Sequence, residues 1–140
     1  MITHQDSIEL AARLQLPEIA QRVVRGEKLE NNVDIIFRAP LEFYIMDEDQ
    51  QLSYGQGKII PLWDDGNFDE IAGYHIEAER YVRFYVEEDV DAESVPTYSW
   101  QRVLLPHFER LFDLFDGNME KLKDLAAQFQ FDYLEQLVYA

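Results

Sequence analysis

The stretch IIPLWDDGNFDEIAGYHIE (residues 59–77) decides the fold, because it places two β-rich runs around one tight turn. Gly66 and Asn67 at its centre readily take positive φ and favour a hairpin turn. The runs on either side, GKIIPLW (57–63) and IAGYHIE (71–77), have the β-branched and aromatic residues that are typical of strands. Pro61 lacks a backbone donor, so its strand is predicted to lie at an edge of the sheet or to end there.

Three more runs of the same kind predict further strands: VDIIF (33–37), LEFYIM (41–46) and YVRFYVEE (81–88). In the last run the alternation places Val82, Phe84 and Val86 on one face of a half-buried strand, and Tyr81, Arg83 and Tyr85 on the other. Successive strands follow one another without helices between them, which favours antiparallel pairing. We expect a mostly antiparallel sheet of about four to six strands.

Helical patterns precede and follow these strands. Asp6 and Glu9 have the spacing of a capping box for a first short helix. Pro17 suits the first position of a second helix, and Gly26 suits its end.

After an acidic loop at residues 89–96, large apolar residues recur at intervals of three or four and predict an amphipathic helix: Trp100, Val103, Leu104, Phe108, Leu111, Phe112 and Phe115. Pro106 predicts a kink or a restart inside it. Gly117 and Asn118 end this helix, and a last helix is predicted to begin at Met119 and to continue through Tyr133, Leu134, Leu137 and Val138. Helices, then strands, then helices indicate a single α+β domain over residues 1–140, with the helices on one face of the sheet.

The charge balance restricts the classes of partner. Asp and Glu number 28 against 12 Lys and Arg, a formal net charge of −16. Such a surface repels nucleic acid and anionic membranes, whereas it attracts a basic protein over long range. The alternative is an acidic surface that only keeps the protein in solution. The chain has no cysteine and no apolar segment typical of a secretory signal, so we expect a cytoplasmic protein without disulfides.

Motifs for common chemistries are missing from the sequence. No phosphate-binding glycine loop and no G-x-S-x-G nucleophile motif occur. His75 and Glu77 spell H-x-E, but a zinc deaminase also needs cysteines, so we predict a cross-strand hydrogen bond instead. Three scattered histidines without cysteine predict no transition-metal site and no cofactor.

Carboxylates leave two alternatives open. Asp47 and Asp49 match only the first positions of a calcium loop, since Leu52 and Lys58 stand where glycine and glutamate are needed. The acids of WDDGNFDE either gather around a cation, as in a small cation-dependent hydrolase, or remain hydrated around a turn; the sequence favours the turn.

The order GKIIPLWDDGNFDEIAGYHI, then YVRFYVEED, then TYSWQRVLLPHFERLF resembles the SUKH superfamily over residues 57–115. The resemblance implies an α+β binding scaffold without catalytic residues. Bacterial members are commonly immunity proteins that neutralise a toxin, often a nuclease or a nucleic-acid deaminase, and fungal relatives regulate cell-wall assembly. A net charge of −16 suits a basic, nucleic-acid-directed toxin.

These observations predict a partner-binding surface. Its negative charge is assigned to Asp64, Asp65, Asp69, Glu70, Glu87, Glu88 and Asp89. Trp63, Phe68 and Tyr85 are the candidate aromatic anchors, although Trp63 and Phe68 also suit the core. A third hypothesis is a regulatory scaffold in which the C-terminal aromatic helices form a dimer face. The sequence neither indicates nor excludes a homo-oligomer.

Overall fold

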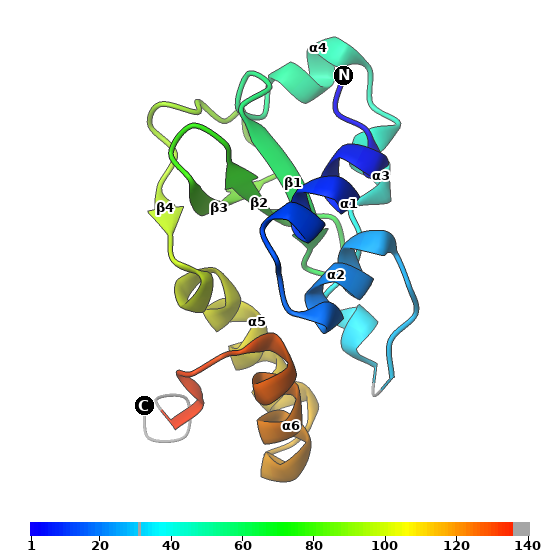
Figure 1. Ribbon diagram of the computed structural model, residues 1–140, viewed down its shortest axis with the longest axis vertical. Coiled ribbons are helices and arrows are strands. Elements are labelled where there is room, and N and C mark those ends of the chain that lie inside the picture. The colour runs from blue at the N-terminus through cyan, green and yellow to red at the C-terminus, as the bar shows by residue number, and fades with distance from the viewer. Residues whose placement is uncertain (31, 136–140) are drawn as a thin grey trace.

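The protein contains a four-stranded antiparallel sheet, ordered β1-β2-β3-β4 (Figure 1). Its strands are β1 (Ile59–Asp64), β2 (Glu70–His75), β3 (Arg80–Tyr85) and β4 (Thr97–Tyr98). The computed structural model describes residues 1–30 and 32–135. The predicted α+β class, the antiparallel sheet and the strands at 57–63, 71–77 and 81–88 are confirmed.

The strand β1 forms one edge of the sheet, as Pro61 predicts. Its register with β2 runs from Ile59 opposite His75 and shifts between Pro61 and Trp63. On the outer side of β1, the backbone of Asp64 forms an isolated antiparallel bridge with Arg38. This bridge covers the C-terminal end of β1, just before the turn to β2.

Helices flank the sheet at both ends of the chain. The N-terminal helices are α1 (His4–Arg13) and α2 (Glu18–Arg25), and the C-terminal helices are α5 (Trp100–Leu114) and α6 (Met119–Phe129). Helix α1 packs against β1 and α2, while α6 contacts both α2 and α5. The N-terminal and C-terminal helices therefore contact each other through α2 and α6 (Figure 1).

The strands predicted at 33–37 and 41–46 are wrong. The first segment forms the 3₁₀ helix η1 (Val33–Ile35) and the second forms the short helix α3 (Leu41–Tyr44), followed by α4 (Glu48–Leu52). Val33, Ile36 and Phe37 are buried while Ile35 is exposed. The buried positions are thus separated by three and four residues, which is a helical spacing, and a short apolar run conceals it.

Two helix starts differ from the prediction. Helix α1 is capped by Thr3, whose hydroxyl accepts the Asp6 N–H while the Asp6 carboxylate accepts the Thr3 N–H. The capping box therefore begins three residues before Asp6. Pro17 is the N-cap of α2 instead of its first residue, and Gly26 ends α2 at φ +80° as predicted.

The C-terminal helices begin as predicted but do not extend as far. Helix α5 continues through Pro106 as one element, without a restart. Helix α6 ends at Phe129 because Gln130 takes φ +56°, so the predicted continuation through Tyr133 is wrong. Leu137 and Val138 lie outside the described residues.

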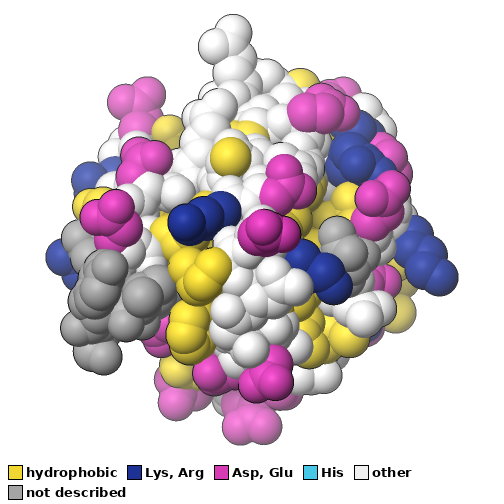
Figure 2. All heavy atoms as spheres, turned by 90° about the horizontal axis from the view of Figure 1, so that it is seen from below, with side chains coloured by type: hydrophobic (Ala, Val, Ile, Leu, Met, Phe, Trp, Pro, Cys, Tyr) yellow, Lys and Arg dark blue, Asp and Glu magenta, His cyan; other side chains and the backbone are white. Residues whose placement is uncertain are grey.

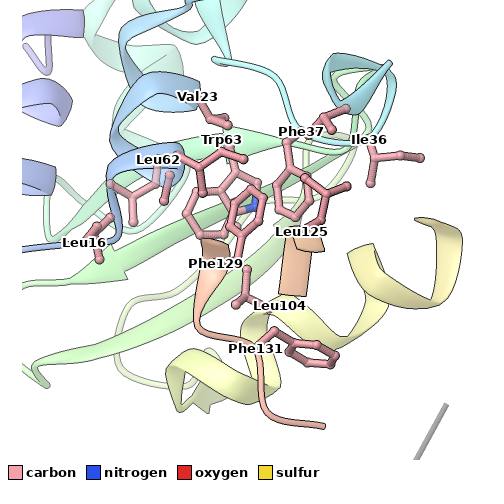
Figure 3. Packing of buried hydrophobic residues seen from close by; sticks show 14 of the residues in the cluster. Leu16, Val23, Ile36, Phe37, Leu62, Trp63, Leu104, Leu125, Phe129 and Phe131 are labelled. Carbon is pink, nitrogen blue, oxygen red and sulfur yellow. The ribbon is translucent and has the colours of Figure 1, made fainter. Parts of the chain in front are cut away.

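The sheet is covered on both faces. On one face, α1, α2, α5 and α6 enclose the larger core, where Trp63, Phe37 and Phe129 lie close together (Figure 3). On the other face, Ile71, Val82 and Phe84 form a smaller core with Phe43 of α3. The long N-terminal and C-terminal helices thus share one face as predicted, while α3, in a segment predicted to be a strand, packs on the other face.

Within residues 1–30 and 32–135, no helix is long and apolar enough to cross a membrane.

Candidate functional site

The turn between β1 and β2 uses its aspartates to stabilise its own backbone. Asp65 Oδ1 accepts the N–H groups of Asn67 (3.2 Å) and Asp69 (3.1 Å). Gly66 takes φ +96°, and Phe68, not Asn67, takes the second positive φ, +58°. The predicted turn is confirmed, and the Asp65 carboxylate belongs to it.

Asp64 lies fully inside the protein. Its Oδ2 accepts from Arg38 Nη2 at 2.8 Å, and its Oδ1 accepts the Gly66 N–H at 2.7 Å. Burial raises the pKa of Asp64, while the hydrogen bonds from Arg38 and Gly66 oppose that shift. Asp64 therefore belongs to the fold and is not on the candidate surface.

Trp63 is also fully buried, so it is a core residue and not an exposed anchor. Its indole Nε1–H donates to Nε2 of His107 at 2.9 Å. Since an indole nitrogen can only donate, His107 is neutral and carries its proton on Nδ1. This nitrogen makes no hydrogen bond of good geometry within the described residues.

The titration of His107 is shifted by its surroundings. Burial lowers the pKa of His107 to about 3, the positive charge of Arg110 acts in the same direction, and the Ile36 carbonyl opposes both. Phe37 stacks on the imidazole with ring centroids 4.5 Å apart. Protonation would thus place a charge among aromatic rings and remove the acceptor of the Trp63 N–H.

Acid should therefore destabilise the protein through His107. Between pH 6.5 and about 3 the unfolded chain binds a proton that the folded chain does not, so stability falls as pH falls, by up to about 1.4 kcal/mol per pH unit. A His107→Gln variant keeps a hydrogen-bond acceptor for Trp63, but its side chain does not bind a proton in this pH range. Urea unfolding at several pH values between 4 and 7 should show a shallower acid loss in the variant. Equal slopes in the two proteins would contradict this role.

His75, the last residue of β2, forms its hydrogen bonds with backbone groups. Its Nε2 donates to the Ala92 carbonyl (2.9 Å), and its Nδ1 accepts the Ala78 N–H (3.1 Å). Glu77 is exposed and pairs with Lys58 at 3.4 Å instead. The predicted cross-strand bond of His75 is therefore wrong: the histidine ties β2 to the loop that follows β3.

Glu70 and Phe68 are half-buried. Burial raises the pKa of Glu70, and Arg83, 3.7 Å away, opposes the shift. Phe68 packs against the smaller core. Neither side chain is fully exposed for contact with a partner.

The remaining predicted residues do come together. Asp69, Tyr85, Glu87 and Glu88 line an open hollow of about 350 Å³, which we call the first hollow. Tyr85 is 58% exposed, although it is a large aromatic side chain. Asp89 lies in the wall of an adjacent hollow. Within the described chain, no ion pair involves Asp69, Glu87, Glu88 or Asp89.

A longer acidic segment than the one predicted surrounds these residues. From Phe84 to Gln101 the sequence has no Lys or Arg, and its acids are Glu87, Glu88, Asp89, Asp91 and Glu93. At the end of the molecule where α5 and α6 lie, by contrast, magenta acids alternate with dark blue basic side chains (Figure 2). The absence of basic residues is the sequence signal that would have identified Asp91 as part of the surface.

The alternative hypotheses receive less support. Asp64 and Glu70 have raised pKa values, as a catalytic carboxylate would, but neither lines the hollows described above. In residues 1–30 and 32–135, no group of three or more His, Asp or Glu side chains is arranged to hold a metal ion. Of the C-terminal aromatic residues proposed for a dimer face, Phe108, Phe129 and Phe131 are buried in the core.

Comparison of the chain with protein-family models, with curated proteins and with solved structures finds no match. Fold and surface together describe an α+β domain with an open, acidic, tyrosine-containing face.

Proposed function

We propose that this protein is a non-catalytic binding module that neutralises a basic protein partner, and that the partner is a nucleic-acid-directed toxin domain. The observation that carries the proposal is the first hollow, where exposed Tyr85 stands among Asp69, Glu87 and Glu88. The resemblance of residues 57–115 to the SUKH superfamily supports the immunity role. A cytoplasmic location belongs to the same proposal.

The charges explain how such a module would act. Unpaired carboxylates at the rim of an interface raise the association rate with a cationic partner, and they do so over long range at low ionic strength. An exposed tyrosine brings a large, rigid apolar surface that is desolvated on contact and so slows dissociation. Toxins that act on nucleic acid need a basic substrate cleft, and an acidic face would cover that cleft.

A growth assay tests the immunity role. We expect that a neighbouring reading frame encodes a large chain that ends in a basic domain. Cells that produce this domain should stop growing, and co-expression of the present protein should restore their growth. Growth arrest that persists despite co-expression would overturn the immunity role.

A kinetic comparison tests the surface itself. The triple variant Asp69→Asn, Glu87→Gln, Glu88→Gln should associate with the basic domain about tenfold more slowly at low salt and should show a weaker salt dependence. Stopped-flow fluorescence at 20 and 300 mM salt measures both effects.

A matched control separates local from net charge. Glu109, Asp113 and Asp116 are exposed acids at the α5 end of the molecule. Their triple variant, Glu109→Gln, Asp113→Asn, Asp116→Asn, changes the net charge equally. If both triple variants slow association to the same extent, the charge of the whole protein and not the first hollow steers the partner.

A further inference from the structure

A second hollow lies beside the first. It has a volume of about 340 Å³ and shares Tyr85 and Glu88 with the first hollow. Its wall also includes Asp89, Asp91, Val95, Pro96 and Tyr98. The side chains of Tyr85 and Glu88 therefore border both hollows.

The second hollow exists because β4 is short. Only Tyr81 and Val82 of β3 pair with β4, opposite Tyr98 and Thr97. The next residue towards the N-terminus is Pro96, which has no N–H to continue the ladder. The preceding loop diverges from β3 there and leaves space beside Arg83 and Tyr85.

This loop is held in place by hydrogen bonds. The Val90 N–H donates to the Ser53 carbonyl at 2.8 Å, and the Gly55 N–H donates to the Val90 carbonyl at 2.9 Å. The Gln56 side chain accepts the Ala92 N–H at 2.9 Å. The carboxylates of the loop thus stand on a fixed backbone, which lowers the entropy cost of binding.

Two residues in the wall of the second hollow, Arg83 and Tyr98, form a contact between a guanidinium group and a tyrosine ring. Arg83 lies over Tyr98 with its Cζ atom 4.4 Å from the ring centroid, and its Nη1 atom lies 3.7 Å from Glu70 Oε1. A guanidinium is weakly hydrated and planar, so it packs on aromatic faces more readily than an ammonium group does. Tyr85, exposed between acids, offers the same kind of ring to a cation from outside.

We propose that the two hollows together bind an extended, arginine-containing segment of the partner, with one guanidinium in each hollow and Tyr85 between them. Alternate side chains of an extended segment point the same way and lie roughly 7 Å apart, a separation that accommodates one intervening ring. Asp69 and Glu87 face the first arginine, and Asp89 and Asp91 face the second. This inference rests on the proposed function and specifies the chemistry of its partner.

The test uses a seven-residue peptide of alternating serine and arginine, blocked at both ends, and ¹⁵N-labelled protein. At 20 mM salt the peptide should shift the amide signals of Asp69, of residues 85–91 and of Tyr98. A lysine peptide should bind more weakly, and a citrulline peptide, which has the shape of arginine without its charge, should not bind.

Two variants make the test specific. Tyr85→Ala should raise the Kd of the arginine peptide about 2- to 5-fold, because a cation over an exposed ring contributes about 0.5–1 kcal/mol. Tyr85→Phe keeps the ring and should change the Kd little. The triple variant of Glu109, Asp113 and Asp116 should bind as the original protein does.

The outcomes distinguish this inference from the proposed function. If the arginine peptide does not bind, if its shifts spread over acids outside the two hollows, or if Tyr85→Ala leaves the Kd unchanged, the two-hollow binding mode is wrong. The growth assay then decides separately whether the protein still neutralises a basic domain by another contact. Rescue of growth without peptide binding would overturn this inference alone.

Discussion

Replacing Arg38 with methionine should lower the free energy of unfolding by about 3–5 kcal/mol, the effect of leaving a buried charge without its partner. The carboxylate of Asp64 is fully buried and has Arg38 as its ion-pair partner. Methionine fills similar space but cannot neutralise the carboxylate. Urea or thermal unfolding at pH 7 measures the loss.

Substitution of the other partner, Asp64, should lower the free energy of unfolding less, because Arg38 is more exposed than Asp64. Asp64→Asn retains an oxygen for the Gly66 N–H, and the side chain of Arg38 is 37% exposed and also pairs with Glu42 at 2.7 Å. We expect a loss of about 1–2 kcal/mol. The double variant should be less unstable than the sum of the single variants, since the stranded charge is gone.

Glu42→Gln is the control for this pair. Its ion pair with Arg38 is largely exposed, and such pairs contribute about 1 kcal/mol or less. If Arg38→Met destabilises the protein no more than Glu42→Gln does, Asp64 is hydrated and the ion pair does not hold the turn. If Asp64→Asn leaves stability unchanged and slows association with the partner, Asp64 belongs to the binding surface after all.

Asp64 also shows why the candidate site could be predicted only in part. The sequence WDD places two acids side by side, and nothing local distinguishes the one that faces Arg38 from the one that faces water. Arg38 is 26 residues away in sequence. Acidic residues are mostly exposed, so the sequence alone predicts both aspartates on the surface. The ion pair with Arg38 makes Asp64 the exception.

The predicted surface residues that the structure brings together have a local signal in the sequence. Glu87, Glu88 and Asp89 follow directly on the aromatic strand β3, so the end of the strand carries them to the surface. Asp69 precedes β2, which pairs with β3 so that Glu70 stands opposite Tyr85. Hairpin register, which alternation and turn chemistry largely specify, therefore brings these acids together.

The secondary structure was predictable in segments with a clear strand or helix pattern, and not in segments where the two patterns compete. The β1–β2–β3 meander has strong turns and clear alternation. The segments at 33–37 and 41–46 are short apolar runs, and in runs of this length the apolar pattern of the sequence does not distinguish a strand from a helix. Pro40 is the N-cap of α3, and Asp47 with Gln50 forms a capping box at α4, so the sequence has local signals for helices beside these apolar runs.

Replacing Gly66 with alanine should destabilise the protein by more than about 3 kcal/mol, combining strain at positive φ with a steric clash. Gly66 takes φ +96°, and a Cβ atom placed on it would lie 1.8 Å from the Ile35 carbonyl oxygen. This is a backbone atom at the end of η1, so relief of the clash requires the turn and the 3₁₀ helix to separate. The Gly66 N–H bond to Asp64, and with it the pair with Arg38, would be displaced by the same movement.

Gly117→Ala is the matched control. Gly117 also takes a positive φ, +76°, but nothing lies within 4 Å of an added Cβ atom. Its cost should therefore be limited to backbone strain, about 1–2 kcal/mol. Denaturant unfolding of both variants compares the two contributions directly. Equal losses would mean that the turn yields without disturbing Ile35, and the hydrogen bonds of Asp65 would then be the main constraint on the hairpin that supports the acidic face.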